Sequence, residues 1–564
     1  MTGTPASPGE QRSLEGPRAW MKAGLVSFVT ALAILTPFFW LGTASGHDIS
    51  FHISSWFDAA GQWKEGILFP RWTEWANYGF GEPRFIFYPP LSWMLGAGLG
   101  SILPWTWIPA LFVLVVQTFA GMSAFGLLRR AVGSFRAALF GAVAYAANPY
   151  ALLVIYLRSD FAELLATAFY PLLFLAALRL GGMLEDDLRQ RKTIAQFGAL
   201  FATVWLSNAP AGVLASYSLA LLFLWAAVRQ KNVQPALLGV SGIALGLGLA
   251  AFYIAPAAYE QRWVNIGGAL SEGLTPRENF LFAVTTDAEH DAFNRIASYV
   301  ALLLIVCILG GALAVWQKSR TADRTFQAML VLGVVATVMM VRVTDPLWTL
   351  LPKLRFVQFP WRLTTVLAVV FAFLVATAAR RALVFSWIAL LLIATLTGAY
   401  LVKHTWWDTE DVNTVKEAVD TRTGFEGTDE YDPLGDDHTD VPQKQPEASP
   451  LVEKGESEFT PKPDLRVLRW TAEDRIVVVK SARGANIRLR LLHYPAWLVS
   501  INGRPAQTHR TVSYDAVVVT IPAGESRIEA HFKQSADRTI GGCISAVSVL
   551  VAGWLVWPLK RRKA

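Results

Sequence analysis

Long apolar segments separated by short polar stretches are the dominant pattern of this chain. A helix needs about 20 apolar residues to cross the hydrocarbon core of a bilayer. Segments of this length predict about twelve transmembrane helices, near 23–44, 107–128, 136–156, 162–180, 193–208, 210–228, 236–256, 297–316, 326–342, 363–379, 382–402 and 540–557. The apolar stretch 91–103, between Pro90 and Pro104, is too short to span and predicts a re-entrant or interfacial helix.

The charges between these segments predict an orientation. Lys and Arg collect in short clusters at 129–130, 189–192, 229–231, 318–324, 380–381 and 560–563. Clusters of this kind mark the cytoplasmic side of a membrane protein. Both termini, including the tail 1–22, are then cytoplasmic. The outer side receives the regions 45–106, 157–161, 259–295, 343–362 and 403–539, and we expect the function to lie among them.

The last outer region has two parts. Residues 403–464 are rich in Asp, Glu, Pro, Gly and Thr, which predicts a solvated linker or extended loop. Residues 465–535 change to alternating and β-branched runs, with an Asn502-Gly503 hairpin signal. This pattern predicts a small antiparallel β domain, a sandwich, tethered to the membrane by 23–402 and by the final helix and basic tail 540–564.

Composition supports a multi-pass membrane protein. The chain of 564 residues is 53% hydrophobic and 16% charged, which excludes an ordinary soluble protein. The net charge of +7 follows from the clusters just described and does not indicate a nucleic-acid partner. Cys307 and Cys543 both fall in apolar segments, so no disulfide framework is available. Spacings typical of zinc ligands are missing from the sequence.

An acid follows the first predicted span directly. Asp48, flanked by His47 and His52, precedes a segment dense in Trp, Tyr and Phe that is typical of interfacial helices. We interpret this segment as a cap that holds Asp48 over a cavity at the membrane surface. The alternative is a solvated carboxylate that caps the next helix.

A second outward turn also carries acids. Asp160 and Glu163 are three residues apart at the start of a predicted helix, so both carboxylates can face the same side. With Asp48 they could hold a divalent cation such as Mg²⁺ or Mn²⁺, or supply a base that activates a hydroxyl. The alternative is a capping box, in which Asp160 caps the helix and Glu163 answers it.

Cationic candidates lie beside the membrane as well. Arg158 precedes Asp160, and Arg355 and Arg362 lie in the outer loop 343–362. Arginine is costly to bury in a bilayer, and its planar fork matches phosphate. These residues are candidates for binding a phosphate, and the alternative is snorkelling to lipid headgroups. Substrate contacts are predicted for His47, His52, Glu82, Arg84, Gln358 and Trp361, although a turn also explains Glu82 and Arg84, and most tryptophans here suit an interfacial belt.

Several of these motifs resemble a known family. The stretches 46–52, 70–72, 79–83 and 87–91, with 158–163 and 356–362, resemble the bacterial membrane proteins described as 6-pyruvoyl-tetrahydropterin synthase-related. The stretch 494–505 is similar to the outer domain of YfhO-like membrane proteins. Motifs of a soluble pterin synthase are missing. Both groups look like glycosyltransferases of the GT-C fold.

The resemblance implies a polytopic all-α, GT-C-like membrane domain with a C-terminal β domain, in the bacterial cytoplasmic membrane. It further implies transfer of a sugar, with inversion, from a polyprenyl-phosphate donor to an outer glycan, lipid or protein. Asp48 matches the base of that fold, and Asp160 with Glu163 could match its metal-assisting acids. The first loop carries His47-Asp48 instead of a DxD motif. The rival interpretations are a flippase for a lipid-linked glycan and a non-catalytic partner in envelope polysaccharide assembly.

Overall fold

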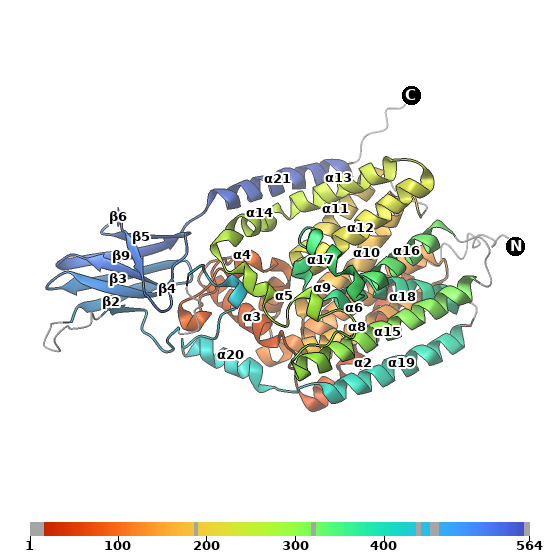
Figure 1. The fold of residues 1–564 in the computed structure, drawn as a ribbon, viewed down its shortest axis with the longest axis horizontal. Helices are drawn as coiled ribbons and strands as arrows, with labels where there is room; N and C mark the ends of the chain where they lie inside the picture. The colour runs from red at the N-terminus through yellow and green to blue at the C-terminus, as the bar shows by residue number, and fades with distance from the viewer. Residues whose placement is uncertain are drawn as a thin grey trace, which may run out of the picture.

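The structure, a computed structural model, describes residues 16–184, 190–316, 323–380, 382–435, 441–451 and 462–557. A bundle of helices forms the larger part of the molecule, and a β domain projects from one end of it (Figure 1). The last helix, α21, Ala536–Val556, starts beside the β domain and runs along the bundle away from it. This arrangement confirms the predicted membrane domain with a C-terminal β domain.

Nine helical segments of the described residues are long and apolar enough to cross a membrane. They are Pro17–Leu41 (α2), Trp105–Ala131 (η2, α6), Phe135–Arg158 (α7, α8, η3), Phe161–Leu180 (α9, α10), Ala209–Gln230 (α12), Ala288–Trp316 (α15), Pro360–Ala379 (η9, α18), Leu383–His404 (α19) and Ala536–Val556 (α21). Two further helix pairs are long and apolar enough to span when each pair is taken together, but both are bent. Gln234–Leu249 meets Ala251–Trp263 at 76°, and Arg324–Met339 meets Arg342–Leu350 at 86°.

The described residues thus hold nine to eleven candidate spans, close to the predicted number of about twelve. The predicted span 193–208 is a helix, α11, Gln190–Ser207, but it is not among them. Its first turn holds Gln190, Arg191 and Lys192, which lower its apolar content. The stretch 91–103 contains α5, Pro90–Gly100, whose 11 residues extend about 16 Å and cannot cross a bilayer.

A cap covers one end of the bundle. It contains α3, Ile49–Lys64, a turn η1 at Asn77–Gly79, α4, Arg84–Phe87, and α5. Trp56 and Trp72 in this segment are at most 1% exposed. The prediction of an interfacial aromatic belt is therefore wrong for these two side chains, because both rings fill the interior of the protein.

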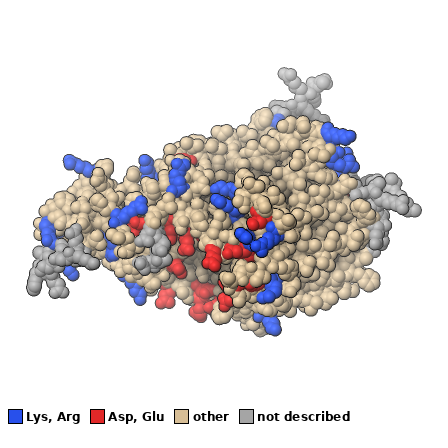
Figure 2. Space-filling view, in the orientation of Figure 1, with Lys and Arg blue, Asp and Glu red and all other residues tan. Residues whose placement is uncertain are grey.

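The acidic segment 403–464 is more ordered than predicted. It contains α20, Glu410–Asp420, and a turn η10 at Asp429–Tyr431. Val412 and Val415 lie on one side of α20, are buried and belong to the core that includes α3. Figure 2 shows acidic side chains gathered over this part of the surface, between the β domain and the helical bundle. The prediction of a solvated extended loop is wrong for α20, because its two valines supply an apolar face.

Two antiparallel sheets form the β domain. One has the order β1-β4-β8-β7 and the other β2-β3-β9-β5-β6. The strands are Ala448–Pro450 (β1), Asp464–Trp470 (β2), Asp474–Ser481 (β3), Ala485–Leu492 (β4), Trp497–Ile501 (β5), Arg504–Pro505 (β6), Thr508–Arg510 (β7), Ala516–Ile521 (β8) and Gly524–Phe532 (β9). Buried residues of both sheets share one core, as a sandwich requires.

The hairpin at Asn502-Gly503 is confirmed. Ile501 pairs with Arg504 across the turn, and Asn502 and Gly503 have φ angles of 52° and 75°. Positive φ at both central residues is the two-residue turn that matches strand twist.

A buried ion pair attaches the β domain to the bundle. Arg538 of α21 donates from Nε and Nη2 to Glu260 of α14, Ala251–Glu260, at 2.8 and 2.9 Å. Tyr494 of the β domain donates its hydroxyl to the same carboxylate at 2.5 Å. Glu260 and Arg538 are both buried. Each charge depends on the other, because an unpaired buried charge is strongly destabilising.

We expect Glu260→Gln to lower the free energy of unfolding by about 3 to 5 kcal/mol, because Arg538 then stays buried without its counter-ion. Thermal unfolding of the purified protein measures the change. The control is Glu529→Gln, which breaks a largely exposed pair with Arg527 and should cost about 0 to 1 kcal/mol. Equal effects of the two substitutions would contradict the assigned role of Glu260.

Buried acids also lie where the cap meets the β domain. Burial raises the pKa of Asp58 to about 7, and burial with the neighbouring charge of Asp58 raises the pKa of Glu74 to about 8. Arg475 of β3 is the cation that most opposes the shift at Glu74, and it is itself 1% exposed.

The raised pKa of Glu74 predicts a stability that falls as the pH rises. Above its ordinary value of 4.5 the unfolded chain releases this proton, while the folded protein keeps it up to about pH 8. Folding is therefore opposed increasingly between these two values. We expect Glu74→Gln to flatten the decline of melting temperature between pH 5 and pH 8, whereas Glu525→Gln, on an exposed strand end, should leave it unchanged. Parallel profiles of wild type and Glu74→Gln would refute this.

Candidate functional site

Two connections between helices meet at the centre of the candidate site. Residues 42–48 link α2 to α3, and residues 159–160 link η3, Val154–Arg158, to α9, Phe161–Ala168. The backbone N–H of Asp48 donates to the carbonyl of Arg158 at 2.9 Å. The Ser159 hydroxyl accepts from the N–H of Gly46 at 3.0 Å and donates to the carbonyl of Ala44 at 2.9 Å. These bonds fix the position of Asp48 relative to Arg158.

Gly46 permits this close approach. A Cβ atom at Gly46 would lie 2.4 Å from the carbonyl carbon of Arg158 and 2.6 Å from the carbonyl oxygen of Leu157. Side-chain carbons do not approach backbone atoms this closely. Residue 46 must therefore be glycine for the two connections to stay in register.

A π-helical turn ends at Arg158. The segment η3, Val154–Arg158, is a π-helix, and Ser159 after it takes a left-handed conformation with φ 53° and ψ 32°. Single π-helical turns often occur at functional sites. Asp160 then becomes the N-cap of α9, where its Oδ1 accepts from the N–H of Glu163 at 2.9 Å. The predicted capping role of Asp160 is present, but the Glu163 side chain does not answer it and instead contacts arginine.

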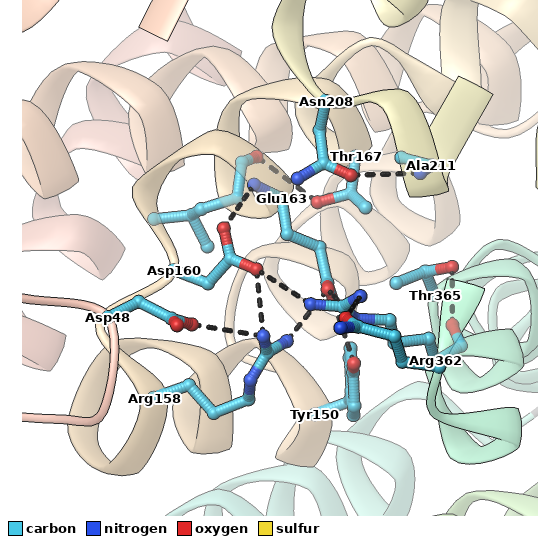
Figure 3. A network of polar contacts seen from close by, with 12 residues as sticks. Asp48, Tyr150, Arg158, Asp160, Glu163, Thr167, Asn208, Ala211, Arg362 and Thr365 are labelled. Carbon is cyan, nitrogen blue, oxygen red and sulfur yellow. Dashed lines mark hydrogen bonds and ion pairs between the residues drawn. The ribbon is translucent and has the colours of Figure 1, made fainter. Parts of the chain in front are cut away.

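Five charged side chains form an ion cluster, defined as Asp48, Arg158, Asp160, Glu163 and Arg362 (Figure 3). Arg158 Nη2 contacts Asp48 Oδ2 at 3.0 Å and Asp160 Oδ2 at 2.9 Å, and its Nη1 contacts Glu163 Oε2 at 2.8 Å. Arg362 Nε contacts Glu163 Oε2 at 2.9 Å, and its Nη2 contacts Asp160 Oδ2 at 3.4 Å. The structure therefore brings together five residues that the sequence indicates as candidates.

Exposure differs sharply within the ion cluster. The side chains of the other four members are at most 7% exposed, whereas that of Asp48 is 37% exposed. Burial alone would raise the pKa of Asp160, but Arg158 above all holds it well below its usual value. Asp48 is thus the carboxylate that a molecule arriving from solvent can reach.

Arg362 lies after a strained turn. Gln358 has φ 66° and ψ −53°, and across it the N–H of Phe359 donates to the carbonyl of Val357 at 2.7 Å. This is a γ-turn of the rare, positive-φ kind. A side-chain-bearing residue in such a conformation costs about 1 to 3 kcal/mol and is found preferentially at functional sites. The ring of Phe359 lies under both guanidinium groups, 4.8 Å from that of Arg362 and 5.7 Å from that of Arg158.

The sequence analysis missed Tyr150. Its hydroxyl donates to Glu163 Oε1 at 2.6 Å, so it occupies the second oxygen of that carboxylate (Figure 3). Tyr150 lies within an apolar span, and its position there carries no signal that distinguishes it from a core tyrosine.

Arg355, Glu82 and Arg84 are among the predicted residues that lie outside the ion cluster. Arg355 is exposed, and its guanidinium stacks at 5.0 Å on the ring of its neighbour Phe356. Glu82 and Arg84 form a separate buried pair, with Arg84 Nε 2.6 Å from Glu82 Oε1. Arg84 also donates to Ser54 and Thr428, so this pair joins the cap to the segment after α20.

The two predicted histidines have different surroundings. His47 is exposed on one side and packs at 4.7 Å against Phe293, where burial lowers its pKa although Asp48 opposes the shift. His52 is 1% exposed, and its Nε2 accepts from the N–H of Phe161 at 3.1 Å. Trp361 is also 1% exposed. His47 therefore lies at the surface beside Asp48, while His52 and Trp361 are interior side chains.

The residues present do not fit a divalent metal ion. Asp160 and Glu163 face the guanidinium groups of Arg158 and Arg362, which would repel a cation at the same oxygen atoms. Within the described residues, no three His, Cys, Asp or Glu side chains gather in a way that could hold a metal. We therefore assign neither Mg²⁺ nor Mn²⁺ to these carboxylates.

The fold and the ion cluster define a multi-pass membrane protein with a charged site at the ends of its helices. Residues 85–406 match the family described as 6-pyruvoyl-tetrahydropterin synthase related domain, a membrane protein. Because the match covers more than half of the 564 residues, the chain belongs to this family. The predicted resemblance is confirmed. The matched region includes all of the ion cluster except Asp48.

No curated protein matches the chain. Among solved structures, the crystal structure of the Archaeoglobus fulgidus oligosaccharyltransferase in the apo form aligns with 16% identity and a TM-score of 0.37. The alignment covers 73% of this chain and 56% of that one, so this chain spans little more than half of that protein's length.

We expect Gly46→Ala to separate Asp48 from Arg158, because the added methyl group overlaps the Arg158 backbone. The overlap should lower stability by about 1 to 3 kcal/mol. Thermal unfolding measures the loss, and hydrogen exchange at the Asp48 amide should accelerate with it. The control is Gly98→Ala in α5, where a Cβ meets nothing within 4 Å and alanine should be neutral or stabilising. Unchanged exchange at Asp48 in Gly46→Ala would refute this assignment.

Proposed function

We propose that this protein is an integral-membrane glycosyltransferase of the GT-C type that moves a sugar from a polyprenyl-phosphate donor to an acceptor hydroxyl. The observation that carries the proposal is the placement of Asp48, a 37% exposed carboxylate held by Arg158 at the edge of a buried ion cluster. A general base must be reachable by substrate, and this placement supplies that property.

Asp48 acts as the base in this proposal. Arg158 contacts its Oδ2, and no contact of its Oδ1 is found within the described residues, so Oδ1 is the atom that would accept the proton. The acceptor oxygen forms a bond to the anomeric carbon as its proton passes to Asp48. The bond between that carbon and the phosphate oxygen breaks, polyprenyl phosphate leaves, and the anomeric configuration inverts.

Arg355 is the best candidate for the phosphate among the three predicted arginines. The guanidinium groups of Arg158 and Arg362 are already engaged by carboxylates. Arg355 is exposed, lies in the loop that leads to Arg362 and contacts only an aromatic ring in the described part of the chain. Stabilising the charge that develops on a leaving group contributes strongly to catalysis. Arg158 and Arg362 would then hold the acids in place.

The proposal includes an orientation. The ion cluster and the β domain would face the outer side of a bacterial cytoplasmic membrane, and the lipid tail would lie along the apolar spans. The cap and the β domain would position an envelope glycan, lipid or protein as acceptor.

We expect Asp48→Asn to reduce sugar transfer by about 10²-fold or more, the contribution typical of a general base. The assay uses protein reconstituted in liposomes, radiolabelled polyprenyl-phosphate sugars and an envelope fraction as acceptor. The control is Asp420→Asn, which alters an exposed acid of α20 that pairs with Lys416.

The same experiment measures sugar transfer by the wild-type protein in excess EDTA. We expect no loss of transfer activity, because arginines occupy the carboxylates that a metal ion would need. Full transfer by Asp48→Asn would refute the catalytic role of Asp48. Binding of the donor by wild type without any transfer, together with complementation of a deletion strain by Asp48→Asn, would favour a transporter or an assembly partner instead.

A further inference from the structure

The side chain of Gln358 forms hydrogen bonds with two separate parts of the molecule, the loop at Ala269 and the side chain of Arg362. Its Nε2 donates to the carbonyl of Ala269 at 2.8 Å, and its Oε1 accepts from Arg362 Nη1 at 3.4 Å. Ala269 belongs to a short turn, η5, Ile266–Leu270, of the loop between α14 and α15. Gln358 thus lies between this loop and the ion cluster.

The strained turn contacts Arg362 twice. Arg362 Nη1 donates to the carbonyl of Val357 at 3.0 Å as well as to Gln358 Oε1. The opposite edge of the same guanidinium faces Asp160 and Glu163. The position of the turn therefore sets how far Arg362 reaches into the ion cluster.

A positive-φ residue other than glycine keeps its conformation only where surrounding contacts hold it. At Gln358 those contacts include the two hydrogen bonds of its own side chain, beside its backbone N–H, which donates to the carbonyl of Arg355 at 3.0 Å. We propose that Gln358 is a positioning residue: its Nε2 holds the Val357–Phe359 turn against the loop at Ala269, and its Oε1 holds Arg362 on Asp160 and Glu163. Its effect on sugar transfer rests on the proposed function, whereas its effect on Arg362 does not.

The loop that receives Gln358 is itself tied to distant segments. The N–H of Asn265 donates to the carbonyl of Asp432 at 2.9 Å, and the N–H of Leu434 donates to the carbonyl of Trp263 at 2.9 Å. The ring of Trp263 packs at 5.5 Å against Tyr494 of the β domain. Through Gln358, Arg362 is therefore linked to the part of the chain that docks the β domain.

Three variants separate the parts of this proposal. Gln358→Gly relieves the backbone strain and removes both hydrogen bonds. Gln358→Glu keeps an acceptor for Arg362 but cannot donate to the Ala269 carbonyl. The matched control is Lys353→Gly in the same loop, which also relieves a positive φ, 62°, but whose side chain contacts Gln261 rather than Arg362.

Two measurements need no substrate. Phenylglyoxal labelling followed by mass spectrometry reports the release of Arg362, which is 6% exposed in the folded protein. Hydrogen exchange of residues 266–270 reports the hold on the loop. We expect Gln358→Gly to accelerate both by about tenfold, the size of effect of losing one hydrogen bond to a charged group. Gln358→Glu should accelerate only the exchange, and Lys353→Gly should change neither.

If Gln358→Gly keeps the wild-type rate either of Arg362 labelling or of hydrogen exchange at 266–270, the proposal is overturned. It requires the Gln358 side chain to hold both Arg362 and the loop. Equal acceleration by Lys353→Gly also overturns it, since loop flexibility alone would then explain the result. In the transfer assay we expect Gln358→Gly to lower kcat and leave the KM for the donor unchanged. If wild type transfers no sugar, the proposed function fails, and the labelling and exchange results still decide the role of Gln358.

Discussion

The balance of three carboxylates against two guanidinium groups is the interaction on which this structure most depends. Charges taken out of water are tolerated only when their partners compensate them, and here Arg158 and Arg362 compensate Asp160 and Glu163 almost completely out of contact with solvent. The surrounding backbone is correspondingly specialised, with a π-helical turn before Arg158, a left-handed residue at Ser159 and a strained turn at Gln358. Arg158 contacts all three carboxylates and Arg362 contacts two of them, so the cluster acts as a unit.

The position of Asp48 follows from this balance. Two guanidinium groups cannot neutralise three carboxylates fully, and the carboxylate at the edge is the one that retains contact with water. Its place is fixed from behind by the backbone contact at Gly46, which leaves no room for a side chain. An exposed acid on a rigid, charged support is a reasonable base for a transfer reaction, whereas the engaged arginines are poor candidates for holding a substrate phosphate. In the proposed reaction the phosphate contact therefore falls to Arg355.

Segments distant in sequence hold this site together. The cap, the segment around α20 and the β domain are joined by buried polar pairs, Glu82 with Arg84 and Glu260 with Arg538. Both pairs link residues of the membrane domain to residues beyond position 403, since Arg84 also bonds Thr428 and Glu260 also bonds Tyr494. The β domain is therefore anchored on the cap side of the bundle, and a movement of it would reach the loop that contacts Gln358.

The sequence by itself determined the features that depend on local periodicity and composition. Apolar length predicted most of the spans, alternation predicted the main strands, and Asn502-Gly503 predicted its hairpin, because each is set by neighbouring residues. The candidate acids and both arginines of the ion cluster were also visible as charges beside apolar segments. Only the tertiary structure decided which charges meet, because Asp48 and Arg362 are separated by more than 300 positions. It likewise decided that Arg355 stays outside the cluster and that Tyr150 contacts it through Glu163. It also decided that Trp56 and Trp72 lie inside the protein, since burial is a property of the packed fold and not of the local sequence.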